Sequence, residues 1–313
     1  MSFASEVKNE LSRVETEKKC CQLAEIAGFL RVAGSIGLAG LGKFKIIITS
    51  ENPAVIRHYK KLLHDYFDIE TNLEVGESSS VGKKREYKIT IDADNRSEQI
   101  LRETGILLVR EGNNYISDGI YDGIVRSKCC KRAYLRGIFM GAGTMSDPEK
   151  SYHLELVCGT ETLSHDLKKL INSFVDLQAK EFKRGKNFVV YVKKADYVAD
   201  MLGIIGADTH SLIIDNTLVE KSVKNEANRM ANCDNANTDR MVAAAMKQIE
   251  AVEKIEEKKG ISWLPYKLRE VALLRKEHPD ISIKELGELC DPPLKKSGIN
   301  SRLKKIEDIA SKL

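Results

Sequence analysis

The fold of this chain is decided by residues 19–36, KCCQLAEIAGFLRVAGSI, which recur in altered form as residues 128–145, KCCKRAYLRGIFMGAGTM. The two copies align without a gap and are identical at seven of 18 positions, which chance rarely produces. The shared residues of the first copy are Lys19, Cys20, Cys21, Ala24, Gly28, Ala33 and Gly34. Each copy has the length and apolar content of a buried helix that ends at a glycine.

The segments that follow the two copies also correspond. A strand, an amphipathic helix, a strand pair and a further helix are expected after each copy. They are residues 45–49, 53–67, 70–75 with 86–92, and a helix from 97 in the first half, and residues 152–157, 162–175, 177–182 with 188–192, and 195–204 in the second. An opening helix carries Phe3, Val7, Leu11 and Val14 on one face. The sequence predicts an α+β domain of two pseudo-symmetric halves over residues 1–210.

Composition limits the classes of protein to which the chain can belong. Its 313 residues suggest about two domains, and 50 Lys and Arg against 46 Asp and Glu give a net charge too small to indicate nucleic acid alone. No apolar run approaches the ~18 to 20 residues of a membrane span, and residues 1–6 lack the order of a secretion signal. Seven cysteines with two adjacent pairs do not suggest a disulfide framework. We expect a soluble intracellular protein, and not a secreted, membrane-embedded or disordered one.

Residues 26–34, IAGFLRVAG, and residues 135–143, LRGIFMGAG, resemble two degenerate LAGLIDADG motifs. In LAGLIDADG homing endonucleases, two such helices pack at the centre of a pseudo-dimer, and flanking sheets form a saddle over DNA. Glycine and alanine at ~3 to 4 residue spacing suit this packing because they let two helix backbones approach closely. The resemblance therefore implies a two-repeat LAGLIDADG-like domain.

The catalytic acid of that family is missing from both motifs. The acid at the eighth motif position holds a divalent metal for phosphodiester hydrolysis, and the corresponding residues here are Ala33 and Ala142. A methyl group cannot bind Mg²⁺. Asp147 is better explained as a turn residue before Pro148 than as a substitute ligand. We expect that the fold was kept and the nuclease lost, so that the protein is not an enzyme.

Adjacent cysteines at Cys20–Cys21 and Cys129–Cys130 raise the question of a four-thiolate zinc site. Adjacent helical side chains point roughly 100° apart, however, and zinc-binding pairs usually have the spacing C-x₂-C. Buried structural thiols are therefore the favoured interpretation. The six histidines show no HxxxH or HExxH spacing on a single helix. We expect no metal site and no cofactor.

Two basic loops, Lys83-Lys84-Arg85 and residues 183–186, lie near corresponding strand ends. Phosphate contacts and solvated hairpin tips both remain open for them.

Residues 211–260 are predicted to be an Asn-rich linker with a helix over 241–256 that ends near Gly260. The asparagines are interpreted as helix caps and turns, in preference to groups that contact adenine edges. They are Asn225, Asn228, Asn232, Asn235 and Asn237.

Residues 261–313 are predicted to form a small all-α helix-turn-helix domain. Helices are expected over 265–277, 282–289 and 295–309, with a capping box at the start of the second. Five cations and no acid lie between residues 292 and 306, which favours DNA binding over a protein-interaction module with a basic solvated face. The candidate DNA-binding residues are Ser282, Lys295, Lys296, Ser297, Asn300, Ser301, Arg302, Lys304 and Lys305.

The third helix is expected to enter the major groove, with Ile299, Leu303 and Ile306 facing inward. Asn300 and Arg302 are expected to contact base edges. Lys304 and Lys305 lie further along the helix and are better placed for phosphates.

The whole chain, in this order, resembles the WhiA family of bacterial regulators, which join a degenerate LAGLIDADG domain to a C-terminal helix-turn-helix. The matching stretches include residues 2–11, 232–237 and 278–303. The resemblance implies a non-catalytic, sequence-specific regulator of transcription that binds double-stranded DNA in the cytoplasm, associated with the nucleoid. It further implies a role in cell division, chromosome segregation and, in spore formers, sporulation.

Two other functions remain open at this point. One is a metal-dependent DNA endonuclease that uses unrecognised acids, against which Ala33 and Ala142 argue. The other is a scaffold in which the first domain binds a partner protein and the tail tethers it to DNA. The sequence does not separate this scaffold from the regulator. It gives neither the target DNA sequence nor the oligomeric state, and it leaves open a second regulatory protein as a partner.

Overall fold

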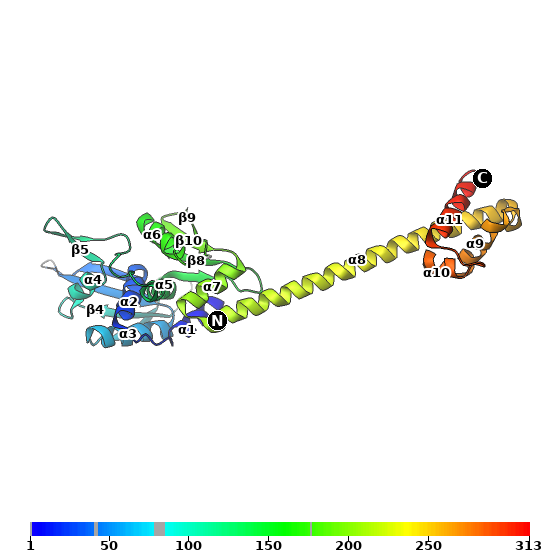
Figure 1. Ribbon diagram of the computed structural model, residues 1–313. Helices are drawn as coiled ribbons and strands as arrows, with labels where there is room; N and C mark the ends of the chain where they lie inside the picture. The colour runs from blue at the N-terminus through cyan, green and yellow to red at the C-terminus, as the bar shows by residue number, and fades with distance from the viewer. Residues whose placement is uncertain (1, 41–42, 78–84, 176) are drawn as a thin grey trace. The chain divides into compact units, whose positions relative to one another are not determined.

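The computed structural model describes residues 2–40, 43–77, 85–175 and 177–313. The chain divides into two compact units, Met1–Glu220 and Lys221–Leu313 (Figure 1). The first unit mixes strands and helices, whereas the elements described in the second are all helices. The predicted fold class, an α+β two-repeat domain followed by a small all-α domain, is confirmed.

Two helices, α2 (Lys19–Ala33) and α5 (Lys128–Ala142), lie side by side at the centre of the first unit (Figure 1). A Cβ atom added at Gly28 would overlap the carbonyl oxygen of Tyr134, and one added at Gly137 would lie 2.8 Å from the amide nitrogen of Phe29. No side chain fits between the two backbones at these points. The close approach through glycines that the repeat predicts is therefore confirmed.

Each central helix leads directly into a four-stranded antiparallel sheet. The strand order is β1-β2-β4-β3 in the first half and β7-β8-β10-β9 in the second, so the topology repeats with the sequence. The strands are β1 (Gly34–Leu38), β2 (Phe44–Ser50), β3 (Leu73–Glu77), β4 (Arg85–Ile91), β7 (Gly143–Met145), β8 (Leu154–Cys158), β9 (Lys180–Arg184) and β10 (Asn187–Val192). The predicted pseudo-symmetry of the two halves is confirmed.

One face of each sheet packs against helices. In β8, Leu154 and Leu156 are buried and alternate with Glu155 and Val157, which are only partly buried. Such alternation is typical of a sheet with one face on the core. The remaining helices of the first unit are α1 (Phe3–Leu11), α3 (Pro53–Phe67), α4 (Ser97–Glu103), α6 (Glu161–Ile171) and α7 (Ala195–Ile205).

Several strands were not predicted from the sequence. Strands β1 and β7 begin at the glycines that end the central helices, and a separate hairpin joins β5 (Leu107–Arg110) to β6 (Asn113–Ile116). These strands are short, and they contain glycine or exposed polar residues. Their local pattern is therefore weak, and β1 and β7 form because β2 and β8 offer an edge with which to pair.

A single helix, α8 (Asp208–Lys259), contains the whole Asn-rich stretch. The interpretation of those asparagines as caps and turns is therefore wrong. Asparagine is a weak helix former. Packing does not compensate for this low helix propensity, since none of residues 218–244 is buried. The first turns of α8 pack in the first unit through Ile214, and its last turns pack in the second through Val252 and Ile255.

The second unit is built from the end of α8 and three further helices, α9 (Tyr266–Glu277), α10 (Ile283–Glu288) and α11 (Lys296–Ser311). A short 3₁₀ turn, η1 (Ile261–Trp263), connects α8 to α9. The three helices form where the sequence predicted them. Among the described residues, none of the helices combines the length and the apolar composition that a bilayer crossing demands.

We expect Gly28→Leu and Gly137→Leu to destabilise the first unit by at least about 1–3 kcal/mol, because a large side chain would force the two helices apart. Gly159→Leu is the matched control, since nothing lies within 4 Å of a Cβ atom added there. Nine of the ten tyrosines belong to the first unit and Trp263 to the second. Tyrosine circular dichroism and tryptophan fluorescence during urea unfolding therefore follow the units separately. Unchanged unfolding of the first unit in both variants would mean that the helices do not meet at these glycines.

Candidate nucleic-acid interface

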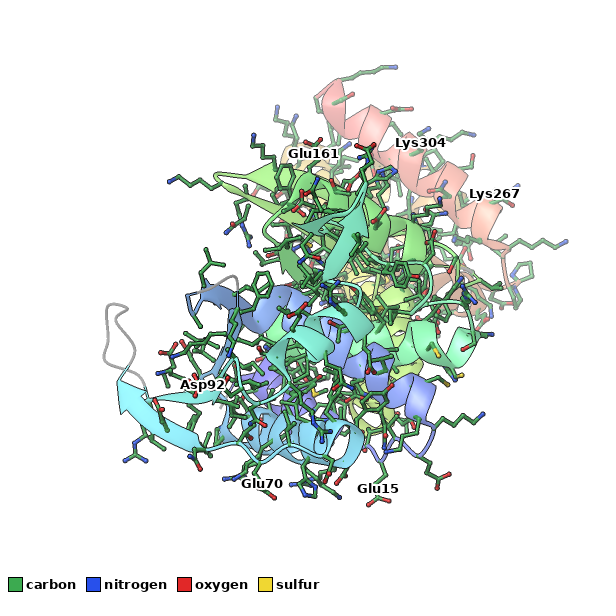
Figure 2. All side chains as sticks on the ribbon, turned by 90° about the vertical axis from the view of Figure 1, so that its left-hand side faces the viewer. Glu15, Glu70, Asp92, Glu161, Lys267 and Lys304 are labelled. Carbon is green, nitrogen blue, oxygen red and sulfur yellow. The ribbon has the colours of Figure 1, made fainter. Side chains whose placement is uncertain are left out.

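Helix α11 has one buried face and one free face. Ile299, Leu303, Ile306 and Ala310 are buried at intervals of three or four residues, so they form a single apolar stripe. From residue 295 to 305 the exposed residues are polar or cationic, among them Lys304 (Figure 2), whereas the next turn carries the half-buried Glu307 and the exposed Asp308. The exposed candidates are Lys295, Lys296, Ser297, Asn300, Ser301, Lys304 and Lys305.

A glycine sets the distance between α10 and the turn that precedes α11. A Cβ atom at Gly287 would overlap the carbonyl oxygen of Leu294 and would lie 3.2 Å from Cγ1 of Ile299. The amide N–H of Leu294 donates to the carbonyl oxygen of Gly287 over 2.8 Å. The close contact fixes the angle at which α11 leaves the turn, and thus which side chains it presents.

The predicted capping box at the start of α10 is confirmed. The hydroxyl oxygen of Ser282 accepts from the amide of Glu285 (3.3 Å), and the carboxylate of Glu285 accepts from the amide of Ser282 (2.8 Å). The backbone hydrogen bond from Ser282 lowers the pKa of Glu285. The structure therefore gives Ser282, one of the candidate DNA contacts, a capping role.

Arg302 differs from the other cations of α11. Its guanidinium donates to the carbonyl oxygen of Lys267 (3.1 Å) and to the carboxylate of Glu270 (3.5 Å), and its side chain is only 21% exposed. These bonds attach α11 to α9. The expectation that Arg302 contacts base edges is at odds with this geometry, because the side chain is held against the neighbouring helix. The sequence did not reveal this role, since Glu270 lies 32 residues away.

The net charge of the chain belongs to the second unit. Residues 1–220 contain 31 Lys and Arg and 31 Asp and Glu, whereas residues 221–313 contain 19 and 15, respectively. A positive excess attracts the phosphate backbone of nucleic acids. The first unit has no such excess.

The sheet faces of the first unit that point away from the core carry paired charges. Lys88 of β4 pairs with Glu74 of β3 at 2.9 Å, and Arg184 of β9 pairs with Glu155 of β8 at 2.8 Å. Burial opposes ionisation of Glu155, but hydrogen bonds from His153 and Arg184 outweigh it and lower its pKa.

The structure describes the cations of the two basic loops to different extents. In the loop of residues 183–186, Arg184 is engaged with Glu155, and the Lys183 ammonium lies 5.6 Å from the ring centre of Phe188. Of the other loop, Arg85 is exposed, whereas Lys83 and Lys84 lie outside the described residues. Contact with phosphate and a role as solvated hairpin tips remain the two alternatives for these loops.

The C-terminal ends of α2 and α5 lie together, as the family's catalytic ends would. A Cβ atom added at Gly141 would lie 3.3 Å from that of Ala33. Ala33 and Ala142 offer no carboxylate there. Asp147 is exposed, and its side chain accepts from the amide of Glu149 at 3.0 Å, so its interpretation as a turn residue is confirmed. Across the described ranges, no group of three or more metal-binding side chains gathers at this end.

A buried ion pair crosses between the central helices. Glu25 of α2 is fully buried and accepts two hydrogen bonds from Arg136 of α5, at 2.8 and 3.0 Å. His58 and Thr16 also contact the Glu25 carboxylate, at 2.7 and 3.0 Å. Burial opposes its ionisation, but the hydrogen bond from His58 and the charge of Arg136 prevail and lower the pKa of Glu25. This pair was not predicted from the sequence, although a charged residue inside each apolar repeat was a signal for it.

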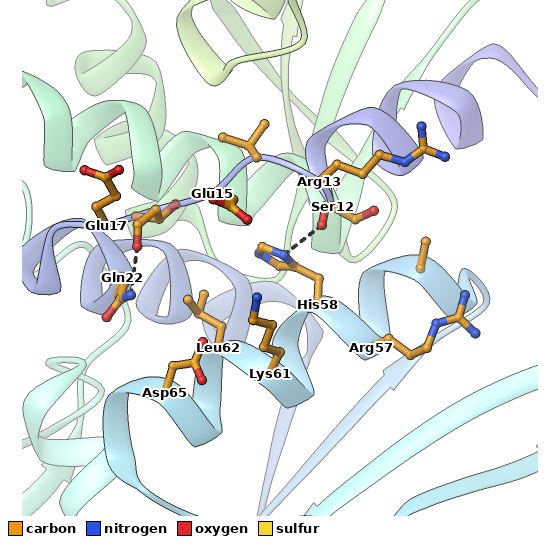
Figure 3. A pocket seen from close by; sticks show the side chains of 13 residues that line it. Ser12, Arg13, Glu15, Glu17, Gln22, Arg57, His58, Lys61, Leu62 and Asp65 are labelled. Atoms are coloured by element: carbon orange, nitrogen blue, oxygen red, sulfur yellow. Dashed lines mark hydrogen bonds between the residues drawn. The ribbon is translucent and has the colours of Figure 1, made fainter.

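A pocket of about 530 Å³ lies beside this ion pair, between α3 and the segment that joins α1 to α2 (Figure 3). His58 lies in its wall, and one of its ring nitrogens is 3.0 Å from the carbonyl oxygen of Ser12. The other charged residues mix both signs and are Arg13, Glu15, Glu17, Arg57, Lys61 and Asp65. This mixture selects neither an anion nor a cation.

Three family models match successive parts of the chain. They are the WhiA N-terminal LAGLIDADG-like domain over residues 19–107, the WhiA LAGLIDADG-like domain over residues 131–224 and the WhiA C-terminal HTH domain over residues 227–310. Among curated proteins, the Probable cell division protein WhiA of Alkaliphilus metalliredigens is 42% identical over 312 residues, which span 100% of this chain and 98% of that relative. The protein of the same name from Clostridium novyi is 40% identical over 313 residues, with the same coverage.

The chain is also similar to solved structures of WhiA proteins. The crystal structure of full-length WhiA from Thermatoga maritima covers 100% of this chain and 99% of that chain, with a TM-score of 0.62 and 27% sequence identity. The crystal structure of the N-terminal LAGLIDADG domain of WhiA covers 66% of this chain and 90% of that chain, with a TM-score of 0.50 and 23% identity. The second likeness is one of fold alone.

We expect Glu25→Gln to destabilise the first unit by about 3–5 kcal/mol, because it leaves the buried guanidinium of Arg136 without a counter-charge. Glu98→Gln is the control, since Glu98 forms an exposed ion pair with Arg102. It should change the free energy of unfolding by less than about 1 kcal/mol. Because the pKa of Glu25 is lowered, its stabilisation is complete above the ordinary carboxylate pKa and is lost as the pH falls through the lowered value. Urea unfolding from pH 7 downward should show that the free energies of unfolding of the parent protein and of Glu25→Gln become equal in acid. A constant difference across that range would contradict the assignment.

Proposed function

This chain belongs to the WhiA family, as its sequence resemblance predicted, and we propose that it is a non-catalytic, sequence-specific DNA-binding regulator. Its relatives are named probable cell division protein WhiA, and its C-terminal unit matches their HTH domain. Cell division is therefore the proposed process. Roles in chromosome segregation and sporulation, and association with the nucleoid, are further parts of this proposal.

The observation that carries the proposal is the free face of α11. From residue 295 to 305 the exposed side chains of this face are polar or cationic, while the opposite face packs in the core of the second unit. A helix held in this way can enter the major groove of DNA without unfolding any part of its own domain. The excess of positive charge in the same unit supports this assignment.

The exposed residues divide into two groups by position. Ser297, Asn300 and Ser301 lie in the first half of α11, and their short polar side chains suit hydrogen bonds to base edges. Lys304 and Lys305 lie further along, and Lys295 and Lys296 lie at the N-terminal end, where phosphates are the better partners. Arg302 is assigned a positioning role, because its guanidinium attaches α11 to α9.

The first unit is proposed to act as a scaffold without catalysis. Ala33 and Ala142 stand where the nuclease family carries its metal-binding acids, and the paired charges on the sheet faces do not favour phosphate binding. The unit then serves to bind another protein or to add weak phosphate contacts through its basic loops. The domain boundaries proposed for these roles remain residues 1–210, 211–260 and 261–313.

Absence of nuclease activity is directly testable. The purified protein should not cut supercoiled plasmid in the presence of Mg²⁺ or Mn²⁺, because neither motif presents a carboxylate where the metal would bind. Gel electrophoresis of the plasmid is the measurement. Reproducible cleavage that EDTA abolishes would reject this part of the proposal, and its loss in Asp147→Asn would identify the substitute ligand.

Alanine substitutions in the two groups of α11 residues should change DNA binding in different ways. After chromatin immunoprecipitation with sequencing has identified a target, we expect Asn300→Ala to weaken binding to it by about 1–3 kcal/mol and to relax preference at one position. Lys304→Ala or Lys305→Ala should weaken binding to all sequences alike and lower the salt slope by about one per lost phosphate contact. Titrations by fluorescence anisotropy at several salt concentrations measure both effects.

Two controls accompany these variants. Lys312→Ala removes an exposed cation beyond the end of α11 and should leave affinity unchanged. Arg302→Ala should lower the stability of the second unit, as followed by Trp263 fluorescence. If Arg302→Ala relaxed sequence preference at full stability, Arg302 would contact a base after all.

A further inference from the structure

Four cysteines gather at the N-terminal ends of the central helices. Cys20 and Cys21 lie in the first turn of α2, and Cys129 and Cys130 lie in the first turn of α5. Their four Sγ atoms lie within 4.8 Å of one another. We call this group the thiol cluster. It occupies equivalent positions of the two repeats, at the end of the helix pair opposite Ala33 and Ala142.

The interpretation of these residues as buried structural thiols does not fit the thiol cluster well. Cys21 and Cys130 are buried, but Cys129 is only partly buried and Cys20 is exposed. The usual C-x₂-C spacing applies to two zinc ligands that lie in one segment of sequence. Here each helix supplies one adjacent pair, and the packing of α2 on α5 brings the pairs together. Helix packing, rather than local spacing, creates the four-ligand set.

We propose that the thiol cluster binds one Zn²⁺ ion that joins the two halves of the first unit. Zinc takes four thiolates in a tetrahedral arrangement with Zn–S distances of about 2.3 Å, which places neighbouring sulfurs about 3.8 Å apart. Since the Sγ atoms already lie within 4.8 Å, each distance has to shorten by about 1 Å at most. Rotation of cysteine side chains supplies such a change without movement of the helices.

The helix N-termini favour the negative charge of bound thiolates, whereas burial of Cys21 and Cys130 opposes it in the absence of a metal ion. All four residues lie at helix N-termini, where the partial positive charge of the helix stabilises anions. The hydroxyl of Ser127 lies 3.1 Å from Sγ of Cys129. A tetrathiolate zinc carries two net negative charges, which suits a site at two helix N-termini.

The proposed site has a structural role. Four protein ligands leave no open position for water or substrate, which is the arrangement of structural zinc. The ion would join α2 of the first half to α5 of the second at one end, while the glycines join them in the middle. It would add stability to the first unit without contact to the proposed DNA-binding helix.

Metal analysis of the full-length protein tests this proposal. The protein is purified with a reducing agent and without chelator, and zinc is measured by plasma mass spectrometry. We expect about one zinc per chain. Replacement by Co²⁺ should give the absorption bands of thiolate-bound, tetrahedral cobalt, which report the ligands independently of any activity. Chelation should lower the melting temperature of the first unit.

The variants are chosen to keep the fold. Cys20→Ser and Cys129→Ser alter the two least buried ligands and should weaken zinc binding at least about tenfold. Cys233→Ser, an exposed cysteine of α8 outside the cluster, should bind zinc like the parent. Far-UV circular dichroism verifies that each variant is folded.

Two results would overturn the proposal. One is a folded, reduced parent protein that neither contains zinc nor shows thiolate bands with Co²⁺. The other is the appearance of disulfides between α2 and α5 in mass spectra of the protein as isolated, together with no bound metal. That outcome would assign the thiol cluster to redox chemistry.

Discussion

Contact between the backbones of α2 and α5 is the constraint on which the first unit depends. At Gly28 and Gly137 there is no space for a side chain between the helices, so the two helix backbones are in direct contact. Three other features follow from this one contact. It brings the thiol cluster together at one end, Ala33 and Ala142 together at the other, and Glu25 against Arg136 in between. The geometry of the helix pair is therefore present although neither Ala33 nor Ala142 supplies a carboxylate.

The ion pair between Glu25 and Arg136 explains how two similar halves stay distinct. The equivalent positions of the repeat hold Tyr134 and Ala27, so each charge occurs in only one half. A buried pair contributes little net stability, because desolvation offsets the attraction, but an unpaired buried charge is strongly unfavourable. Association of two second halves would bury Arg136 without a carboxylate, and association of two first halves would leave Glu25 with only His58 and Thr16 as partners. The pair therefore favours packing of the first half on the second over packing of two like halves.

The sequence was sufficient where a local pattern carries the structure. The repeat located α2 and α5, the glycines identified their contact, and the capping box of Ser282 with the stripe of Ile299 and Leu303 located the helix-turn-helix. It was insufficient where a structure depends on partners far along the chain. Strands β1 and β7 form on the edges of other strands, Arg302 is held by a residue of another helix, and the thiols meet only through helix packing. The asparagines of α8 were misassigned because propensity is a weak guide to a helix.

These features separate a first unit that carries no net charge from a second unit that holds the positive excess and the free face of α11. The central claim is that DNA sequence is recognised by the second unit. A nuclease-protection footprint on one genomic target, comparing the full chain with a protein that ends at Glu220, tests this claim most directly. The full chain should protect a defined sequence, and the shortened protein should protect none at the same concentration. Protection of the same sequence by the shortened protein would place recognition in the LAGLIDADG-like unit and contradict the account.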